Sequence, residues 1–227
     1  MKIPALFFFL TVLLSGCAKV GEALNQQGVA AFNQHRFRTA ARDFHWASFF
    51  QNRDAVNLND EGYALYSAKD YDGADRAFRR AVELSRDEKL NFQIQLNQAL
   101  LHCDQDAILG HPARKDWLPQ GIGIFQKLVL ADPGDAELRM RLGFAQIQNG
   151  NPGGGFLQLD KACRLATPEQ VARYTSHPVE GCLLILRQIQ EFYIKIRYFK
   201  KADEVSLRIA KLERSKPGPI PAITPTF

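Results

Sequence analysis

Apolar and polar residues follow two different patterns along the chain. Residues 3–14 are apolar except for Thr11, and the chain turns polar after Cys17. This run is too short to span a bilayer, because a membrane-spanning helix takes about 20 residues. Farther along, segments such as KLNFQIQLNQALLHC (residues 89–103) place apolar side chains at helical spacing. The pattern therefore predicts an all-α protein behind a short apolar leader.

The helical part of the chain repeats with a period of 34 residues. Each unit has a small residue where the two helices of a hairpin would cross closely, and an aromatic residue later in the second helix. A helix–turn–helix unit of this length is typical of the tetratricopeptide repeat, and the chain resembles that family. The resemblance implies an all-α solenoid whose first helices line a concave groove. The matched pairs are Leu24 with Leu58, Gly28 with Gly62, Phe37 with Tyr71, Ala40 with Ala74, Phe44 with Phe78, and Ala47 with Ala81.

A later unit keeps the spacing but changes the turn. Gly143 and Leu159 stand at the crossing positions, and Pro-Gly-Gly-Gly occupies residues 152–155, where aromatic and alanine residues are expected. Glycine costs about 0.5–1 kcal/mol relative to alanine inside a helix. We therefore expect a loose turn and a second helix that begins late or frays.

Two further units are inferred from weaker matches. One begins near Lys89 and is interrupted by a Gly- and Pro-rich insertion. The other begins near residue 183, where Gln190 and Ser206 replace the glycine and the late aromatic residue. The predicted domains are a signal peptide over 1–16, a solenoid of four to five units over 17–214 with loop insertions near 104–117 and 167–182, and a Pro-rich flexible tail over 215–227. The second insertion is expected to contain a short helix between Pro168 and Pro178.

The apolar leader ends at a specific boundary. A positive start at Lys2, a short apolar core and a small-residue end are typical of a secretory signal peptide. The residues Leu-Ser-Gly-Cys at 14–17 resemble a bacterial lipobox, which implies cleavage before Cys17 and acylation of its thiol and new amino group. Several acyl chains anchor a protein far better than one. The alternatives are an ordinary signal peptide with a chance cysteine, or a buried apolar helix.

The residue after Cys17 is Ala18, not aspartate. In the sorting rule that this motif resembles, the absence of aspartate implies the periplasmic face of the outer membrane of a Gram-negative cell. Cys17 lies about ten residues before Gly28. A flexible linker of that length, at about 5–6 Å times the square root of its residue number, would keep the first repeat within about 20 Å of the membrane.

The positions that line the groove in such repeats carry aromatic, aliphatic and amide side chains here. Amides can bond a peptide backbone through both donor and acceptor, and tyrosine and phenylalanine are rigid anchors. The alternative is that several of them pack internally. The predicted peptide-binding groove contains Asn25, Val29, Phe32, Asn59, Tyr63, Tyr66, Gln93, Asn97 and Phe144, and Met140 falls at an equivalent position.

Candidate catalytic chemistry is sparse, so we predict no enzyme, no metal and no cofactor other than the lipid on Cys17. The histidines show no ligand spacing, and NPGGGF lacks the Lys-Ser/Thr ending of a phosphate loop. Asp60 and Glu61 are interpreted as ordinary solvated helix charges. The net charge of +5 is mild, and an exported protein rarely meets nucleic acid. We therefore expect neither a nucleic-acid partner nor a small-molecule substrate.

Three cysteines remain once Cys17 is assigned to lipid. Cys163 and Cys182 bracket a short irregular segment and could form a disulfide in an oxidising compartment, which would leave Cys103 over. Buried free thiols are the alternative.

The anchor and the repeats together resemble tetratricopeptide lipoproteins of pilus and secretion systems, including pilotins of type IV pilus secretins and the related lipoprotein of tight-adherence (Flp) pilus assembly. The resemblance implies a non-enzymatic assembly factor that grips a secretin segment and directs it to the outer membrane. The alternative is a periplasmic adaptor that regulates proteases, cell-wall hydrolases or outer-membrane protein insertion.

Overall fold

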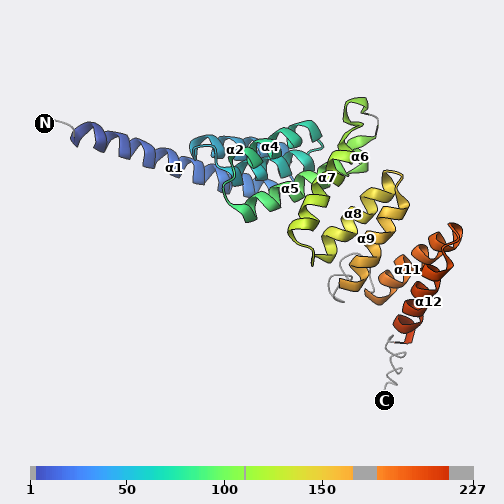
Figure 1. The fold of residues 1–227 in the computed structure, drawn as a ribbon. Helices are drawn as coiled ribbons and strands as arrows, with labels where there is room; N and C mark the ends of the chain where they lie inside the picture. The colour runs from blue at the N-terminus through green and yellow to red at the C-terminus, as the bar shows by residue number, and fades with distance from the viewer. Residues whose placement is uncertain (1–3, 110, 166–177, 215–227) are drawn as a thin grey trace, which may run out of the picture. The chain divides into compact units, whose positions relative to one another are not determined.

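The chain is a series of helical hairpins (Figure 1). The computed structural model describes residues 4–109, 111–165 and 178–214, with side chains from Cys17 and, in the last range, from Cys182. No strand occurs in these ranges. The elements are α1 (Pro4–Asn33), α2 (Phe37–Phe50), α3 (Ala55–Ser67), α4 (Tyr71–Leu84), α5 (Glu88–His102), α6 (Gln105–Ile108), the 3₁₀ turn η1 (Pro112–Arg114), α7 (Trp117–Ala131), α8 (Ala136–Gln148), α9 (Pro152–Leu165), α11 (Pro178–Lys195) and α12 (Phe199–Arg214).

The helices fall into two compact units, Met1–Leu128 and Val129–Phe227. In the first unit α1 pairs with α2 and α3 with α4, while α2 packs on α3 and α4 on α5. In the second unit α8 pairs with α9, α11 pairs with α12, and α9 packs on α11. The predicted all-α array of hairpins is confirmed.

Four hairpins turn in the same way. The second residue after the first helix has a positive φ, and the next backbone N–H donates to a carbonyl five residues earlier. This closes the helix with a Schellman-type turn, in which the left-handed residue lets the chain reverse. The repetition extends to the inferred last unit. The left-handed residues are His35, Lys69, Gly150 and Arg197, and the carbonyls belong to Ala31, Leu65, Gln146 and Tyr193.

Helix starts are set by aspartates in much of the chain. The side chain of Asp54 accepts a hydrogen bond from the backbone N–H of Asn57, and that of Asp70 accepts one from Gly73. Such caps satisfy N–H groups that have no partner inside the helix. Asp87, Asp104 and Asp135 cap α5, α6 and α8 in the same way.

The glycines at the hairpin crossings are needed for close approach, as predicted. A Cβ on Gly28 would lie 2.8 Å from the Phe44 ring, and one on Gly62 would lie 2.6 Å from the Phe78 ring. The inferred last unit has other residues at the positions of the crossing glycine and the late aromatic residue. There the Gln190 Nε2 donates to the Ser206 Oγ at 2.7 Å, again across the hairpin.

The expectation of a frayed helix after Gly150 was wrong. Helix α9 begins at Pro152 and runs to Leu165. The Asn151 side chain caps it by accepting from the Gly154 N–H at 3.0 Å. Proline suits the first turn of a helix, where its missing N–H is not needed. The glycines therefore do not loosen the turn, and Gly155 permits a close crossing with α8.

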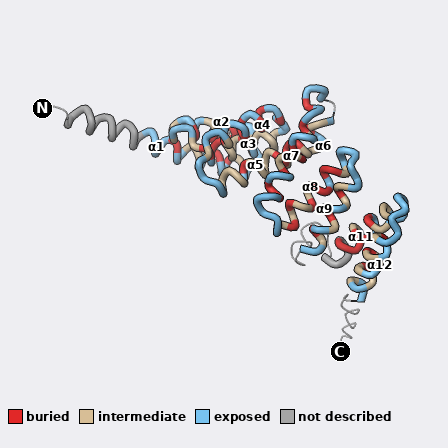
Figure 2. Tube along the Cα trace, in the orientation of Figure 1, coloured by how far each residue is buried: buried red, intermediate tan, exposed pale blue. Residues whose placement is uncertain are grey.

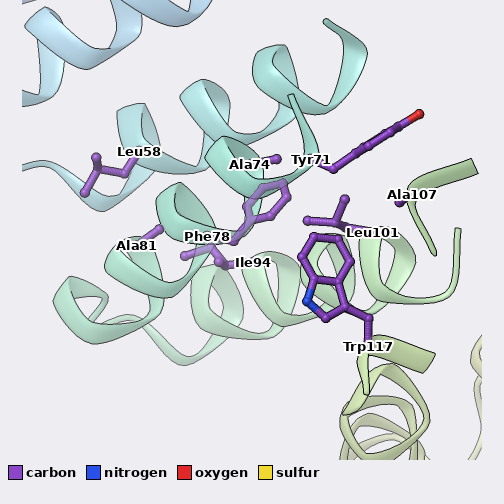
Figure 3. Close-up of a cluster of buried hydrophobic side chains, with 9 residues drawn as sticks. All are labelled: Leu58, Tyr71, Ala74, Phe78, Ala81, Ile94, Leu101, Ala107 and Trp117. Carbon is purple, nitrogen blue, oxygen red and sulfur yellow. The ribbon is translucent and has the colours of Figure 1, made fainter. Parts of the chain in front are cut away.

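The first insertion is not a plain loop, which corrects the prediction for residues 104–117. It forms α6 and η1, and its side chains join the core of the first unit. The buried Arg114 holds both carboxylate oxygens of Asp72, at 2.9 and 2.7 Å, and donates to the Ala107 carbonyl at 2.8 Å. Its guanidinium also lies over the Tyr71 and Trp117 rings. Figure 3 shows the core cluster, which consists of Leu58, Tyr71, Ala74, Phe78, Ala81, Ile94, Leu101, Ala107 and Trp117.

The second unit has its own core, built from α8, α9, α11 and α12. Met140 lies inside it with 2% of its surface exposed, so its assignment to the groove was wrong. The short helix predicted between Pro168 and Pro178 and the tail over 215–227 lie outside the described residues. Figure 2 shows that buried positions recur along the hairpins of both units.

Candidate functional site

Three helices of the first unit line an open, mainly apolar pocket of about 180 Å³. Val29 and Phe32 come from α1, and Tyr63 comes from α3. The Phe32 and Tyr63 rings lie 5.5 Å apart, and Val29 and Tyr63 are 45% and 49% exposed. The buried Phe44 of α2 also lines the pocket. Exposed apolar groups above a buried ring can receive an apolar side chain of a ligand.

A row of amides connects α3 with α5 in the same unit. The Asn97 Nδ2 donates to the Asn59 Oδ1 at 2.9 Å, and the Gln93 Nε2 donates to the Asn97 Oδ1 at 3.3 Å. Amides of this kind can exchange these bonds for bonds to a peptide backbone. The structure therefore brings together six of the predicted groove residues, in a pocket and an adjoining amide row.

One carboxylate lies in the wall of the pocket. Asp60 is half-buried, and the nearest recorded donor is the Asn59 Nδ2 at 3.5 Å. Burial raises the pKa of Asp60 to about 6, the Asn59 contact lowers it, and the charge of Asp54 raises it further. No salt bridge to Asp60 is recorded among the described residues.

The interpretation of Asp60 and Glu61 as solvated charges was wrong. Asp60 lines the pocket, while Glu61 points to the other side of α3 and contacts the His45 Nδ1 at 3.2 Å. Sequence reasoning also missed Phe44 as a pocket residue, because the repeat pattern assigns it to the hairpin crossing. The available signal for Asp60 was its position beside Asn59 on the helix that lines the groove.

The other predicted groove residues have different surroundings. The Asn25 Nδ2 donates to the Oδ1 of the buried Asn57 at 2.5 Å, so this amide joins α1 to α3. The Tyr66 hydroxyl donates to the Asp104 carboxylate, and its ring packs on the core cluster. Burial, followed by that hydrogen bond, raises the pKa of Tyr66 above its ordinary value. Phe144 is 47% exposed on α8 of the second unit.

Comparison with solved structures reveals what kind of hairpin array this is. MamA RS-1, as a double mutant, is 17% identical, with 88% of this chain and 97% of that chain covered and a TM-score of 0.62. YrrB, described as a TPR protein with an unusual peptide-binding site, is 12% identical, with 85% and 86% covered and a TM-score of 0.53. TTC0263, a thermophilic TPR protein in Thermus thermophilus, is 16% identical, with 85% and 98% covered and a TM-score of 0.50. The chain has a tetratricopeptide-repeat fold.

These identities are low, so the likeness concerns the fold of the chain. No protein-family model matches the sequence. No curated protein matches it either. In terms of the repeats, the pocket lies between α1 and α3, the first helices of the first two repeats. The second helix of the first repeat, α2, forms its floor.

The segment around Cys17 differs from the predicted flexible linker. Cys17 is exposed and belongs to α1, which continues without a break to Asn33. At 1.5 Å of rise per residue, Cys17 lies about 16 Å along the helix from Gly28. The connection to the first tetratricopeptide repeat is therefore helical. Among the residues that the structure describes, no helix is both long and apolar enough to cross a membrane.

The cysteines of the second unit are free thiols. Cys163 and Cys182 are nonetheless neighbours, and a hydrogen bond between them followed by burial raises the pKa of Cys163. Cys103 is also free, and burial raises its pKa to about 12. The pairing of Cys163 with Cys182 stays a prediction. Within the described ranges, no group of three or more histidine, cysteine or acidic side chains is arranged to hold a metal ion.

Proposed function

We propose that the protein is a non-enzymatic scaffold, anchored by lipid on Cys17 to the periplasmic face of the outer membrane. Its first two repeats bind a peptide segment of a pilus or secretion-system component, such as a secretin, and so promote localisation or assembly of that component. The observation that carries this proposal is the apolar pocket beside a row of exchangeable amides. The peptide-binding site in the description of YrrB, which has a similar fold, agrees with it.

The chemistry of the pocket suggests what the peptide carries. An apolar side chain can pack against Val29, Phe32 and Tyr63, and a basic group beside it would meet the Asp60 carboxylate. A cation binds more strongly to a half-buried carboxylate without a salt bridge than to a fully solvated carboxylate, because water screens the half-buried charge less. The amides of Asn59 and Asn97 can then bond the backbone of the same segment.

The partner can be identified by crosslinking in cells. A photo-crosslinking residue at Tyr63 should recover a secretin or another pilus component, and deletion of the protein should leave that component unassembled or mislocalised. Normal secretin multimers together with altered cell-wall hydrolase levels would contradict the assembly role. They would favour the alternative, an adaptor for proteases, hydrolases or outer-membrane protein insertion.

Replacing Tyr63 by alanine is expected to weaken binding of the recovered peptide by about tenfold, because the pocket loses its exposed aromatic ring. Fluorescence anisotropy with the labelled peptide measures the effect. Tyr198→Ala is a matched control, since Tyr198 is 50% exposed and Tyr63 is 49% exposed, and it lies in the second unit. Equal affinity of the Tyr63→Ala variant and the wild type would contradict the proposed pocket.

Binding of a peptide with a basic residue beside its apolar anchor is expected to strengthen between pH 5 and pH 7. The pKa of Asp60 is about 6, so the carboxylate gains its charge over this range. The gain should approach about tenfold if the ligand binds only the charged form. The charges nearest the pocket include that of Asp54, and Asp60→Asn should remove the pH dependence. A peptide that covers Asp60 with apolar groups alone would show the opposite trend.

A further inference from the structure

Three aromatic rings gather at the end of α2, and two of them are exposed. Trp46 is 46% exposed, Phe49 is 63% exposed, and Phe50 is half-buried. The Trp46 ring lies 5.8 Å from the Phe49 ring and 6.5 Å from the Phe50 ring, and the two phenylalanine rings lie 5.5 Å apart. Their spacing places them on one side of the helix. These three residues are called the α2 aromatic patch.

The patch lies on the outer side of α2. Ala47 and Gln51 face α1, because a Cβ on Gly21 would lie 3.2 Å from the Ala47 carbonyl oxygen and 2.6 Å from the Gln51 Cγ. On the side toward α3, the Ser48 hydroxyl donates to the Asp54 carbonyl at 3.3 Å. Trp46 and Phe49 are exposed, so they lie on the side of α2 that neither helix covers, whereas Phe50 is half-buried. The outer faces of terminal repeats are normally polar, so an aromatic one requires a covering.

The patch also lies close to Cys17. Helix α1 contacts the end of α2 at Gly21, and Cys17 is one turn earlier, about 6 Å of helix rise away. Val20, in the same turn of α1, is 46% exposed. The exposed side chains in this part of the unit also include Lys19 and Arg53, together with the acidic Glu22.

We infer that the α2 aromatic patch enters the interfacial layer of the bilayer to which Cys17 is attached, and so fixes the orientation of the first repeat on the membrane. The inference rests on the proposed lipid anchor at Cys17. Tryptophan and phenylalanine suit this layer, where an apolar ring body meets the headgroups. Lys19 and Arg53 can meet anionic headgroups at the same end of the unit.

A membrane fits this patch better than a protein does. Acyl chains on Cys17 place the bilayer surface within a helical turn or two of the aromatic rings. A stable protein interface buries roughly 800 Å² on each partner, and an aromatic side chain contributes at most about 150–250 Å². Three rings, one of them already half-buried, fall short of that area.

The emission of Trp46 tests the inference. The full chain is purified from membranes and reconstituted into vesicles of phosphatidylethanolamine and phosphatidylglycerol with brominated acyl chains, which quench tryptophan only within the bilayer. Only two tryptophans are present, and Trp117 is buried in the core of the first unit. We expect quenching in the wild type and its loss in Trp46→Phe. Absence of quenching in the wild type would overturn the inference.

Phe49→Ser provides a second test, since it removes an exposed ring and should not affect folding. We expect loss of Trp46 quenching in this variant, whereas Phe199→Ser is the matched control, because Phe199 is 60% exposed and lies on α12. Unchanged quenching in Phe49→Ser would overturn the inference. A second result would also overturn it: the wild type is a dimer in detergent, Phe49→Ser is a monomer, and lipid does not quench Trp46. The patch would then be covered by a second copy of the chain.

The lipid anchor is tested separately, by the mass of the purified protein and by release of Cys17→Ser from the membrane fraction. A lipidated protein with unquenched Trp46 would refute the inference and leave the anchor standing. An unlipidated protein with quenched Trp46 would refute the anchor and leave the patch as a membrane-binding surface.

Discussion

Replacing Asp75 by alanine is expected to lower the free energy of unfolding of the first unit by about 3 kcal/mol, the upper end of the usual cost of leaving a buried hydrogen-bond donor without its acceptor. The Asp75 carboxylate accepts from the His102 Nε2 at 2.7 Å, the Arg79 Nε at 2.8 Å and the Gln98 Nε2 at 3.1 Å. His102 is 1% exposed and stacks on Trp117, so its ring cannot turn to water. Removing the carboxylate leaves a buried imidazole without its partner.

The surroundings of the two ring nitrogens of His102 indicate which of them donates a hydrogen bond. The Nδ1 is buried and has no hydrogen-bond partner recorded among the described residues, whereas the Nε2 meets Asp75. A proton on Nε2 is therefore satisfied, and a proton on Nδ1 would be a buried donor without an acceptor. We therefore assign the proton of the His102–Asp75 hydrogen bond to Nε2.

Denaturant unfolding followed by circular dichroism measures the loss in Asp75→Ala. Glu83→Ala is a suitable control, because Glu83 is exposed on the same helix, α4, and exposed substitutions usually change stability by less than about 0.5 kcal/mol. Similar losses in the two variants would contradict the structural role of Asp75.

The same carboxylate should make the unit sensitive to acid. Burial alone would raise the pKa of Asp75, but hydrogen bonds from His102 and Gln98 and the nearby charges outweigh burial and hold it below its usual value. The contribution of Asp75 to stability is thus fully present above the unfolded-state pKa of about 3.9. It is lost as the pH falls through the lower folded-state pKa. The loss should be absent in Asp75→Ala.

The second large effect is expected at the crossing of α8 and α9. Gly155→Ala should destabilise the second unit by about 3 kcal/mol, the upper end of the usual cost of overpacking. A Cβ on Gly155 would lie 2.6 Å from the Gly143 carbonyl oxygen and 2.5 Å from the Ile147 Cγ1. The carbonyl belongs to the backbone of a packed helix, so relief requires that the helices separate.

Gly153→Ala is the matched control on the same helix. The nearest atom to its Cβ would be the Phe192 Cζ at 3.7 Å, an ordinary contact distance. Alanine is a better helix former than glycine by about 1 kcal/mol. Thermal unfolding of both variants should therefore show a lower Tm for Gly155→Ala and an unchanged or higher Tm for Gly153→Ala. Equal shifts in the two would contradict the close crossing.

Much of the fold could be predicted because its signals are local or periodic. The residue types at Gly28, Phe44 and their equivalents 34 residues later correspond directly to the helix crossing seen in the structure. The last hairpin was harder, because Gln190 and Ser206 replace the usual residues with a hydrogen bond. A repeat that keeps its spacing but uses other residue types at the key positions is hard to recognise by searching for those residue types.

The errors share a different cause. Glycine content suggested a frayed α9, but propensity is weak against the packing of α9 on α8. The Gly- and Pro-rich insertion suggested a loop, but Arg114 contacts Asp72, 42 residues away, and the rings of Tyr71 and Trp117. Both outcomes depend on contacts between elements, which the composition of one segment does not show.

The sequence by itself determined the period of the repeats, the hairpin order and the lipobox-like boundary at Cys17, because each of these depends on residue spacing along one segment. Only the tertiary structure decided which groove residues stand open and which are bonded internally, as Asn25 and Tyr66 are. It also decided that Asp60 lines an apolar pocket and that the end of α2, which carries the aromatic patch, packs on α1 one turn from Cys17. Burial and pKa are set by what other helices bring into contact, and no local pattern contains that information.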